Sequence, residues 1–226
     1  MILGSSDGAM ANLGIQNNQG DLIVSIGTSV AVRKIMKSLD IKTNGFCYKI
    51  LDEYLIGSSS NNGGNLFSTF DISFETMIEL LHKPLSSSYV LPYVFGERGP
   101  WYKERLKYEV LQGEVLSLKD NVQSLIFAMF SNIELMLESL GFNDDIIYVT
   151  GGFLRDERML QLFANYLNRE IMFVLDEDAV CRGNVLLMRD LEELEYIRCL
   201  PKRNSALLEY KKTSKSLIKS KILDVD

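Results

Sequence analysis

One carboxylate stands near the start of the chain among small residues, in the segment 4–8 (GSSDG). Its Asp7 could accept a proton from a hydroxyl group, because small neighbours leave the carboxylate open to a cleft. About one hairpin later, Gly27, Thr28 and Ser29 would present successive backbone amides and two hydroxyls to an anion. A proton acceptor followed by a phosphate cradle suits phosphoryl transfer to an alcohol. No other phosphate loop precedes Asp7, so these segments predict one half of an active site.

Two glycine pairs stand in front of segments with a helical pattern, namely Gly63-Gly64 and Gly151-Gly152. Glycine lets the backbone approach a ligand closely, and the N-terminus of a helix favours phosphate. Both pairs are therefore candidates for contact with a nucleotide. A glycine pair on its own is more often a turn than a binding site.

Plainer structural roles are open for the same residues. Asp7 could cap a helix that starts near Ala9, and residues 27–29 could form an ordinary hairpin turn. His82 is the only histidine, which argues against histidine-based triads and most zinc sites. We assign no metal ligand and expect a surface or capping role for His82.

The composition is that of an ordinary folded protein. The 226 residues are 46% hydrophobic and 24% charged, and the net charge of −6 gives no reason to expect a nucleic-acid partner. No apolar run reaches the ~18 residues of a membrane span, so we expect no membrane partner. Cys47, Cys181 and Cys199 lack metal-type spacing and favour a reduced, cytoplasmic protein. The basic segment 201–226 predicts a solvated helix face, with an acidic partner or a membrane surface as the alternative.

Hydrophobic spacing predicts short strands first and then strands that alternate with helices. The predicted strands are 22–26, 30–35, 46–50, 54–57, 146–149 and 171–175, and the predicted helices are 61–70, 74–82, 120–140, 157–167, 179–195 and 204–223. This order is typical of an α/β fold with a mixed sheet flanked by helices. Methionine and aromatic residues such as Met129, Phe130 and Phe163 recur at core spacing, so we expect them to be buried.

Five segments resemble one known family in their order and spacing. They are 4–9 (GSSDGA), 24–29 (VSIGTS), 56–65 (IGSSSNNGGN), 91–101 (LPYVFGERGPW) and 149–153 (VTGGF). From about residue 2 to residue 191 the chain resembles the C-terminal domain of the FGGY carbohydrate kinases, and it is most similar to the gluconate kinases. The resemblance implies an RNase H-like, actin-like ATPase domain over residues 1–200. Residues 201–226 would form a basic helix or tail on, or trailing, the same domain.

In this family the γ-phosphoryl group of ATP moves to a hydroxyl of a sugar or sugar acid, with Mg²⁺ as the metal ion. The resemblance implies that Asp7 is the catalytic base and that Asp7 and Gly8 contact the substrate, with gluconate favoured. It also implies a set of nucleotide contacts, which are Gly27, Thr28, Ser29, Gly64, Ser68, Gly151, Gly152 and Asp156. Ser68 is shorter than the usual contact residue and Asp156 carries a negative charge, and either feature would weaken ATP binding.

The family's N-terminal domain supplies the other phosphate loop, an aspartate that helps to hold the metal, and most sugar contacts. We therefore expect the chain to need an N-terminal kinase domain, or a second copy as a homodimer partner, and to be inactive alone. Within the segment 91–101, Glu97 and Arg98 are expected to form an ion pair that supports the cleft.

Several positions depart from the family pattern, and they are Lys103, Arg105, Tyr108, Phe127, Ala128 and Arg182. These departures leave open a module derived from such a kinase that binds a nucleotide or a partner without catalysis. A kinase for another polyol or ketose, such as xylulose or glycerol, is a third possibility. The residues that would discriminate between substrates lie mostly in the other domain.

Overall fold

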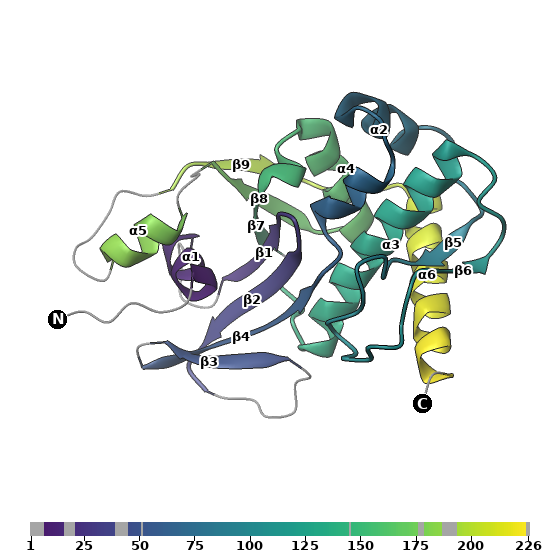
Figure 1. Ribbon diagram of the computed structural model, residues 1–226. Coiled ribbons are helices and arrows are strands. Elements are labelled where there is room, and N and C mark those ends of the chain that lie inside the picture. Colours follow the sequence, from purple (N-terminus) through teal and green to yellow (C-terminus); the bar gives the residue numbers. More distant parts are fainter. Residues whose placement is uncertain are drawn as a thin grey trace.

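Short runs of apolar and β-branched residues build a central sheet in the computed structural model, which describes residues 7–15, 21–38, 45–50, 52–144, 146–175, 179–186 and 194–224. The sheet has seven strands in the order β3-β4-β2-β1-β7-β8-β9 (Figure 1). Their bounds are β1 Leu22–Ile26, β2 Val30–Met36, β3 Phe46–Ile50, β4 Glu53–Ser60, β7 Ile146–Thr150, β8 Glu170–Val174 and β9 Tyr196–Cys199. The predicted α/β fold with a mixed sheet is confirmed.

The two halves of the sheet differ in strand direction. β1, β2, β4 and β3 pair antiparallel, whereas β7 runs parallel to β1 and β8 runs parallel to β7. The parallel register sets Ser25 beside Thr150 near the carboxyl ends of β1 and β7. Because parallel strands end at the same edge of a sheet, the residues that follow them leave that edge side by side. The sheet therefore brings the predicted phosphate turn next to the pair Gly151-Gly152.

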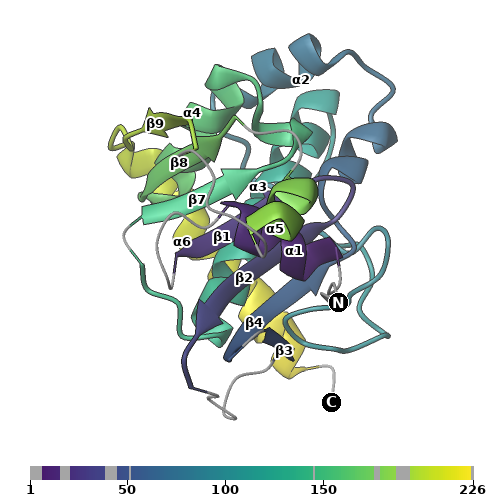
Figure 2. The ribbon, with the colours of Figure 1, turned by 90° about the vertical axis from the view of Figure 1, so that its left-hand side faces the viewer.

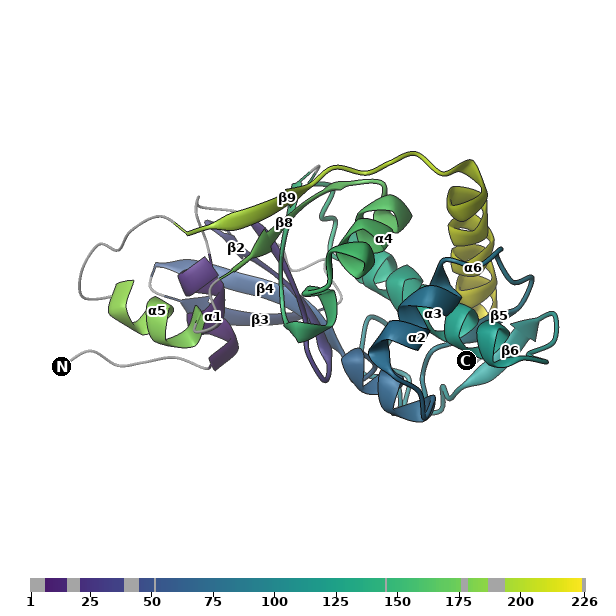
Figure 3. The same cartoon turned by 90° about the horizontal axis from the view of Figure 1, so that it is seen from above.

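Helices cover both faces of the sheet (Figures 1 and 3). Their bounds are α1 Asp7–Ile15, α2 Phe74–Leu81, α3 Leu118–Ser139, α4 Glu157–Leu167, α5 Ala179–Leu186 and α6 Ser205–Leu223. α1 and α5 lie together on one face, α3 and α4 lie on the other, and α2 and α6 pack against α3. Among the described helices, none combines the length and the apolar character needed to cross a bilayer.

The core is divided between these two faces because side chains alternate along each strand. In β1, Leu22, Val24 and Ile26 point into the large cluster around α3, whereas Ile23 packs with Ile15 of α1. The predicted burial of Met129, Phe130 and Phe163 is confirmed, since each has at most 1% of its surface exposed. His82 caps α2, and its Nδ1 lies 2.8 Å from the carbonyl oxygen of Ile78, as expected for a capping role.

Two predicted elements need correction, and three strands were missed. Residues 61–70 do not form an α-helix, because only Gly64–Thr69 coil, and they do so as a 3-10 turn (η1). The helix predicted over 179–195 ends at Leu186 in the described part, and Glu195 lies outside any helix. The chain then forms β9, an antiparallel partner of β8 that was not predicted. A two-stranded sheet of β5 (Tyr89–Leu91) and β6 (Glu109–Gln112) was also missed. These strands are only three or four residues long, too short for alternation to be recognised.

The basic C-terminal segment is not simply a solvated face, contrary to expectation. Lys211 of α6 lies 3.0 Å from a carboxylate oxygen of Glu134 on α3, and Lys219 lies 2.8 Å from one of Glu138. Lys215 contacts both carboxylates, and its side chain is only 16% exposed. The lysines therefore join α6 to the acidic side of α3.

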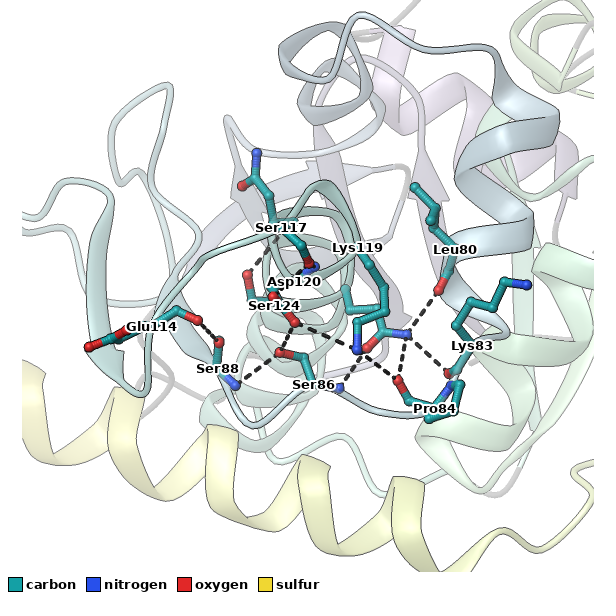
Figure 4. Close-up of polar contacts among 12 residues, drawn as sticks. Leu80, Lys83, Pro84, Ser86, Ser88, Glu114, Ser117, Lys119, Asp120 and Ser124 are labelled. Atoms are coloured by element: carbon teal, nitrogen blue, oxygen red, sulfur yellow. Dashed lines mark hydrogen bonds and ion pairs between the residues drawn. The ribbon is translucent and has the colours of Figure 1, made fainter.

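The segment between α2 and α3 is held by buried polar groups rather than being a loose linker (Figure 4). The hydroxyl of Ser86 donates to Asp120 at 2.7 Å, and the amide of Ser86 donates to Oε1 of Gln123, also at 2.7 Å. The Nε2 group of Gln123 donates to carbonyl oxygens at the end of α2, which belong to Leu80, Lys83 and Pro84. Because buried polar groups are costly unless paired, this network fixes α2 relative to α3.

Helices α1 and α5 cross at two glycines that allow direct backbone contact. A Cβ atom on Gly14 would stand 1.9 Å from the carbonyl oxygen of Ala179. A Cβ atom on Gly183 would stand 1.9 Å from the carbonyl oxygen of Met10. Any side chain at either position would force the helices apart. The two glycines therefore determine the position of α1, and with it the position of Asp7.

The loop that follows β5 is held by Glu97, which does not pair with Arg98 as expected. Its two carboxylate oxygens accept hydrogen bonds from the amides of Trp101 at 3.0 Å and Lys103 at 2.7 Å. Burial raises the pKa of Glu97, and these amide hydrogen bonds partly offset that rise. The loop also packs on β4, since a Cβ atom on Gly99 would lie 2.6 Å from Oγ of Ser58. Glu97 therefore shapes the loop that carries Arg98.

We expect Gly14→Ala and Gly183→Ala each to lower the free energy of unfolding by ~1–3 kcal/mol, because the added methyl group overpacks the contact between α1 and α5. Helix propensity alone would raise the same quantity by roughly 1 kcal/mol, so the sign of the change separates the two effects. Urea denaturation followed by circular dichroism measures it. Asn184→Ala, at an exposed position of α5, is the control. A glycine variant at least as stable as the parent would contradict the close crossing.

Glu97→Ala should loosen the loop that follows β5, because the amides of Trp101 and Lys103 lose their acceptor at a cost of roughly 1–3 kcal/mol. Trp101 is the only tryptophan of the chain, so its fluorescence emission should shift to longer wavelength in the folded variant. Glu104→Ala, at an exposed position in the same loop, should leave the emission unchanged. Identical emission and urea midpoints for Glu97→Ala and the parent would show that the carboxylate does not organise this loop.

Candidate functional site

The turn between β1 and β2 is exposed and rests on the first glycine pair. The amide of Gly64 donates to the carbonyl oxygen of Gly27 at 2.7 Å, and the amide of Asn65 donates to that of Thr28 at 3.3 Å. A Cβ atom on Gly63 would stand 2.6 Å from the backbone of Ser29. The two predicted segments therefore meet in space. The amides of Gly64 and Asn65 therefore hold the turn in place. Because they donate to its carbonyl oxygens, these two amides do not point toward a bound anion.

The second glycine pair packs against the end of β1. Gly151 has a φ of +109°, and a Cβ atom there would lie 2.2 Å from the carbonyl oxygen of Ile26. Only glycine adopts this conformation without strain at so short a distance. Gly152 differs, because a Cβ atom there would meet no atom within 4 Å. Gly151 thus has a packing role, and Gly152 begins the 3-10 turn η2 (Gly152–Leu154) facing open space.

These segments line an open cavity of about 420 Å³, which we call the glycine cavity. Its lining residues are Gly27, Thr28, Gly64, Asn65, Phe67, Phe74, Gly152 and Phe153. The structure thus brings together predicted residues from three distant parts of the sequence. A neighbouring cavity of about 520 Å³ shares Gly152 with the glycine cavity and is also lined by Thr150, Gly151 and Arg155.

Three phenylalanines form an apolar wall of the glycine cavity that the sequence did not reveal. The ring centroid of Phe74 lies 5.7 Å from that of Phe67 and 6.0 Å from that of Phe153, both in edge-to-face geometry. Such geometry is favourable between aromatic rings. In the sequence these residues resemble ordinary core positions, because nothing local shows that α2, η1 and η2 converge.

Two predicted nucleotide contacts lie outside the lining of the glycine cavity. Ser68 is exposed, and its hydroxyl donates to the carbonyl oxygen of Asn65 at 2.7 Å. Asp156 caps α4 by accepting from the amide of Arg158 at 2.8 Å. The Arg158 guanidinium also contacts Asp156 at 2.8 Å and Glu75 of α2 at 2.5 Å, and it lowers the pKa of both carboxyl groups. The charge of Asp156 is therefore matched by Arg158.

Asp7 is the first residue of α1 and is exposed to solvent. α1 lies beside α5 and is close to β2, so its N-terminus approaches the same hairpin that carries the phosphate turn (Figure 2). The next residue, Gly8, faces the guanidinium of Arg33, since a Cβ atom on Gly8 would stand 3.0 Å from Nη2. Asp7 and the turn thus belong to neighbouring parts of one surface.

A smaller cavity of about 210 Å³ lies at Gly8, and we call it the arginine cavity. Ser29, Arg33 and Arg98 help to line it. Because Ser29 lines this cavity while Gly27 and Thr28 line the glycine cavity, the turn separates the two. Arg33 and Arg98 were not predicted as site residues. β2 carries two adjacent charged residues among apolar ones, Arg33 and Lys34, so the sequence does not show which of them enters a cavity.

Comparison with known proteins finds similar sequences and folds among sugar kinases. No protein-family model matches the sequence. The chain is 24% identical to a gluconokinase of Bacillus licheniformis, in an alignment that covers 82% of the chain and 42% of that protein. The solved structure of a ligand-bound xylulose kinase from Lactobacillus acidophilus is similar with a TM-score of 0.83 and 23% identity, over 97% of this chain and 50% of that one.

Two further structures support the same fold. A gluconate kinase from Lactobacillus acidophilus gives a TM-score of 0.81 at 24% identity, and a glycerol kinase from Plasmodium falciparum with ADP gives 0.74 at 13%. Each is matched over 97% of this chain and 50% of the other. The chain thus spans about half the length of the proteins that it matches. It has the actin-like ATPase fold of these enzymes, and its resemblance to the FGGY carbohydrate kinases is confirmed.

Proposed function

We propose that the chain is the C-terminal half of an ATP-dependent kinase that phosphorylates a hydroxyl of a sugar or sugar acid, with gluconate favoured. The single observation that carries the proposal is the position of the turn 27–29 between the glycine cavity and the arginine cavity. A phosphoryl donor on one side of this turn and an acceptor on the other would meet at the turn itself. Phosphoryl transfer depends mainly on such positioning and on electrostatic stabilisation of the transferred group.

The nucleotide would occupy the glycine cavity. Gly152 leaves open the space that a side chain would fill, and Thr28 offers its backbone amide and hydroxyl at the exposed tip of the turn. The phenylalanine wall suits the apolar faces of a nucleoside. Of the other resemblance-based contacts, Ser29 lies at the turn and Gly151 positions Gly152. Ser68 and Asp156 would act only from the margin of the cavity.

Asp7 would accept the proton of the acceptor hydroxyl. In that step the hydroxyl oxygen forms a bond to the γ-phosphorus, and the bond from that phosphorus to the oxygen bridging to the β-phosphate breaks. ADP leaves with the bridging oxygen, and the proton resides on the Asp7 carboxylate. The loose transition state requires of the carboxylate mainly that it orient the acceptor hydroxyl. The exposed position of Asp7 at the start of α1 leaves it accessible to an acceptor.

Mg²⁺ would accompany the phosphates of ATP and offset their negative charge. This ion keeps several waters and binds through one or two carboxylates plus substrate phosphates. Within the described part of the chain, no group of three histidine, cysteine, aspartate or glutamate residues forms a metal cluster. We therefore assign no protein ligand to Mg²⁺ in this half.

The remaining wall of the site would come from an N-terminal kinase domain. The matched kinases are about twice as long as the region that this chain covers, and half a cleft cannot exclude water from the transferred group. We therefore expect the chain alone to bind nucleotide without transferring phosphate. Cys47, Cys181 and Cys199 form no disulfide within the described part of the chain, which suits a reducing compartment, so we place the reaction in the cytoplasm.

Gly152→Val should weaken ATP binding by about tenfold or more, because its side chain would project into the glycine cavity and displace the nucleotide. Isothermal titration calorimetry with Mg²⁺ and ATP measures the affinity. The fold should survive, since a Cβ atom at this position meets no neighbour within 4 Å, and a thermal melt checks this. Asn143→Val, at an exposed position outside both cavities, is the control. Equal ATP affinity of Gly152→Val and the parent would show that the nucleotide does not bind in this cavity.

Asp7→Asn should abolish gluconate-dependent release of ADP in a mixture of this chain with a matching N-terminal kinase domain. Loss of a general base costs about 10²–10⁴-fold in rate, whereas ATP binding should stay within about twofold because Asp7 does not line the glycine cavity. A coupled assay for ADP and calorimetry give the two readouts. If the parent mixture binds ATP but shows no turnover, the chain is a nucleotide-binding module without catalysis. Full activity of Asp7→Asn would assign the base elsewhere.

A further inference from the structure

The arginine cavity has a charge pattern that phosphoryl transfer alone does not explain. Its lining residues are Gly8, Ala9, Ser29, Val30, Ala31, Arg33, Phe46, Tyr48, Leu55, Ser59 and Arg98. The only charged side chains among them are the two arginines. In the described part of the chain, no carboxylate lies within ion-pair distance of either guanidinium. Among the described residues, two cations therefore line this small cavity and no anion does.

Arg33 is held in place from several sides. It projects from the middle of β2, its Nη1 group donates to Oγ of Ser25 at 3.4 Å, and its guanidinium lies against the backbone of Gly8. Burial lowers the pKa of Arg33, although an arginine remains charged at neutral pH. A charged group that is partly removed from water gains stability from an anionic partner. The described residues do not supply that partner, so a ligand anion would.

Arg98 reaches the same cavity from the loop that Glu97 organises. Gly99 packs directly on β4, where a Cβ atom would stand 2.6 Å from the carbonyl oxygen of Ser59. Asn62 also donates to the carbonyl oxygen of Gly96 at 2.8 Å. The backbone on either side of Arg98 is thus fixed, while its side chain is exposed. An arginine on a fixed backbone at the mouth of a cavity can approach a ligand without reorganisation of the loop.

We propose that Arg33 and Arg98 together bind the carboxylate group of the acceptor, so that this half of the site selects a sugar acid over an uncharged sugar or polyol. The inference rests on the proposed function for the position of the acceptor beside Asp7. Guanidinium groups bind carboxylates through paired hydrogen bonds in a fixed geometry. The transferred phosphate has its own place on the Gly27–Thr28 side of the turn. A carboxylate on the Gly8 side therefore completes the charge balance of the site.

The test uses the whole chain labelled with ¹⁵N and follows the arginine Nε–Hε signals by NMR. Gluconate is compared with glucitol, which has the same carbon chain and a hydroxymethyl group in place of the carboxylate. Gluconate should shift the signals of Arg33 and Arg98, and glucitol should not. Arg33→Gln and Arg98→Gln should each weaken gluconate binding by about tenfold or more, since each removes a charge-assisted hydrogen bond. Arg203→Gln, an exposed position outside the cavity, should leave the affinity unchanged.

Several outcomes would overturn the inference. Equal shifts with glucitol would show that the carboxylate does not bind the two arginines. Shifts with inorganic phosphate but not with gluconate would show that the arginine pair binds a phosphoryl group instead. Unchanged gluconate affinity in Arg98→Gln would also overturn it, and that variant keeps the test decisive if Arg33→Gln fails to fold. ATP is then titrated into the same samples. ATP shifts at Gly27, Gly64 and Gly152 without any gluconate response would reject this inference alone, whereas the reverse result would reject the nucleotide assignment in the proposed function.

Discussion

The site depends on close backbone packing of three glycine segments at the carboxyl ends of the parallel strands β1 and β7. Gly151 stands against the carbonyl oxygen of Ile26, and Gly64 against that of Gly27, at distances that exclude a Cβ atom. Side chains at these positions would separate the strands from the turns that follow them. The glycines are thus needed first for packing, and the open space at Gly152 follows from that packing.

A second glycine contact serves the opposite face of the sheet. Gly14 and Gly183 let α1 and α5 touch, and α1 then sets its first turn beside Arg33 of β2. On the far side, α3 fills the core and is held to α6 by lysine-carboxylate pairs. The hairpin of β1 and β2 lies between these layers (Figure 1). Its turn is consequently held at its base by backbone hydrogen bonds and is exposed at its tip.

The sequence was informative wherever the relevant interactions are local. The spacing of apolar residues predicted the bounds of α4 correctly and those of α3 within two residues. It failed where distant partners decide the outcome. The lysines of α6 were expected to face solvent. Their partners Glu134 and Glu138 lie about eighty positions earlier in the sequence, so the pairing could not be recognised from the local pattern. Arg33, Arg98 and the phenylalanine wall were missed for the same reason, since each acquires its role only when separate segments meet.

Two of the six departures from the family pattern, Phe127 and Lys103, have structural explanations that bear on function. Phe127 is fully buried and stacks on Tyr166 with ring centroids 5.4 Å apart, so it contributes to the core. The amide of Lys103 donates to Glu97, and its ammonium group donates to the carbonyl oxygen of Ile222, which supports the loop that carries Arg98. Because these residues stabilise the scaffold around the cavities rather than filling them, they are weak grounds for a decayed site.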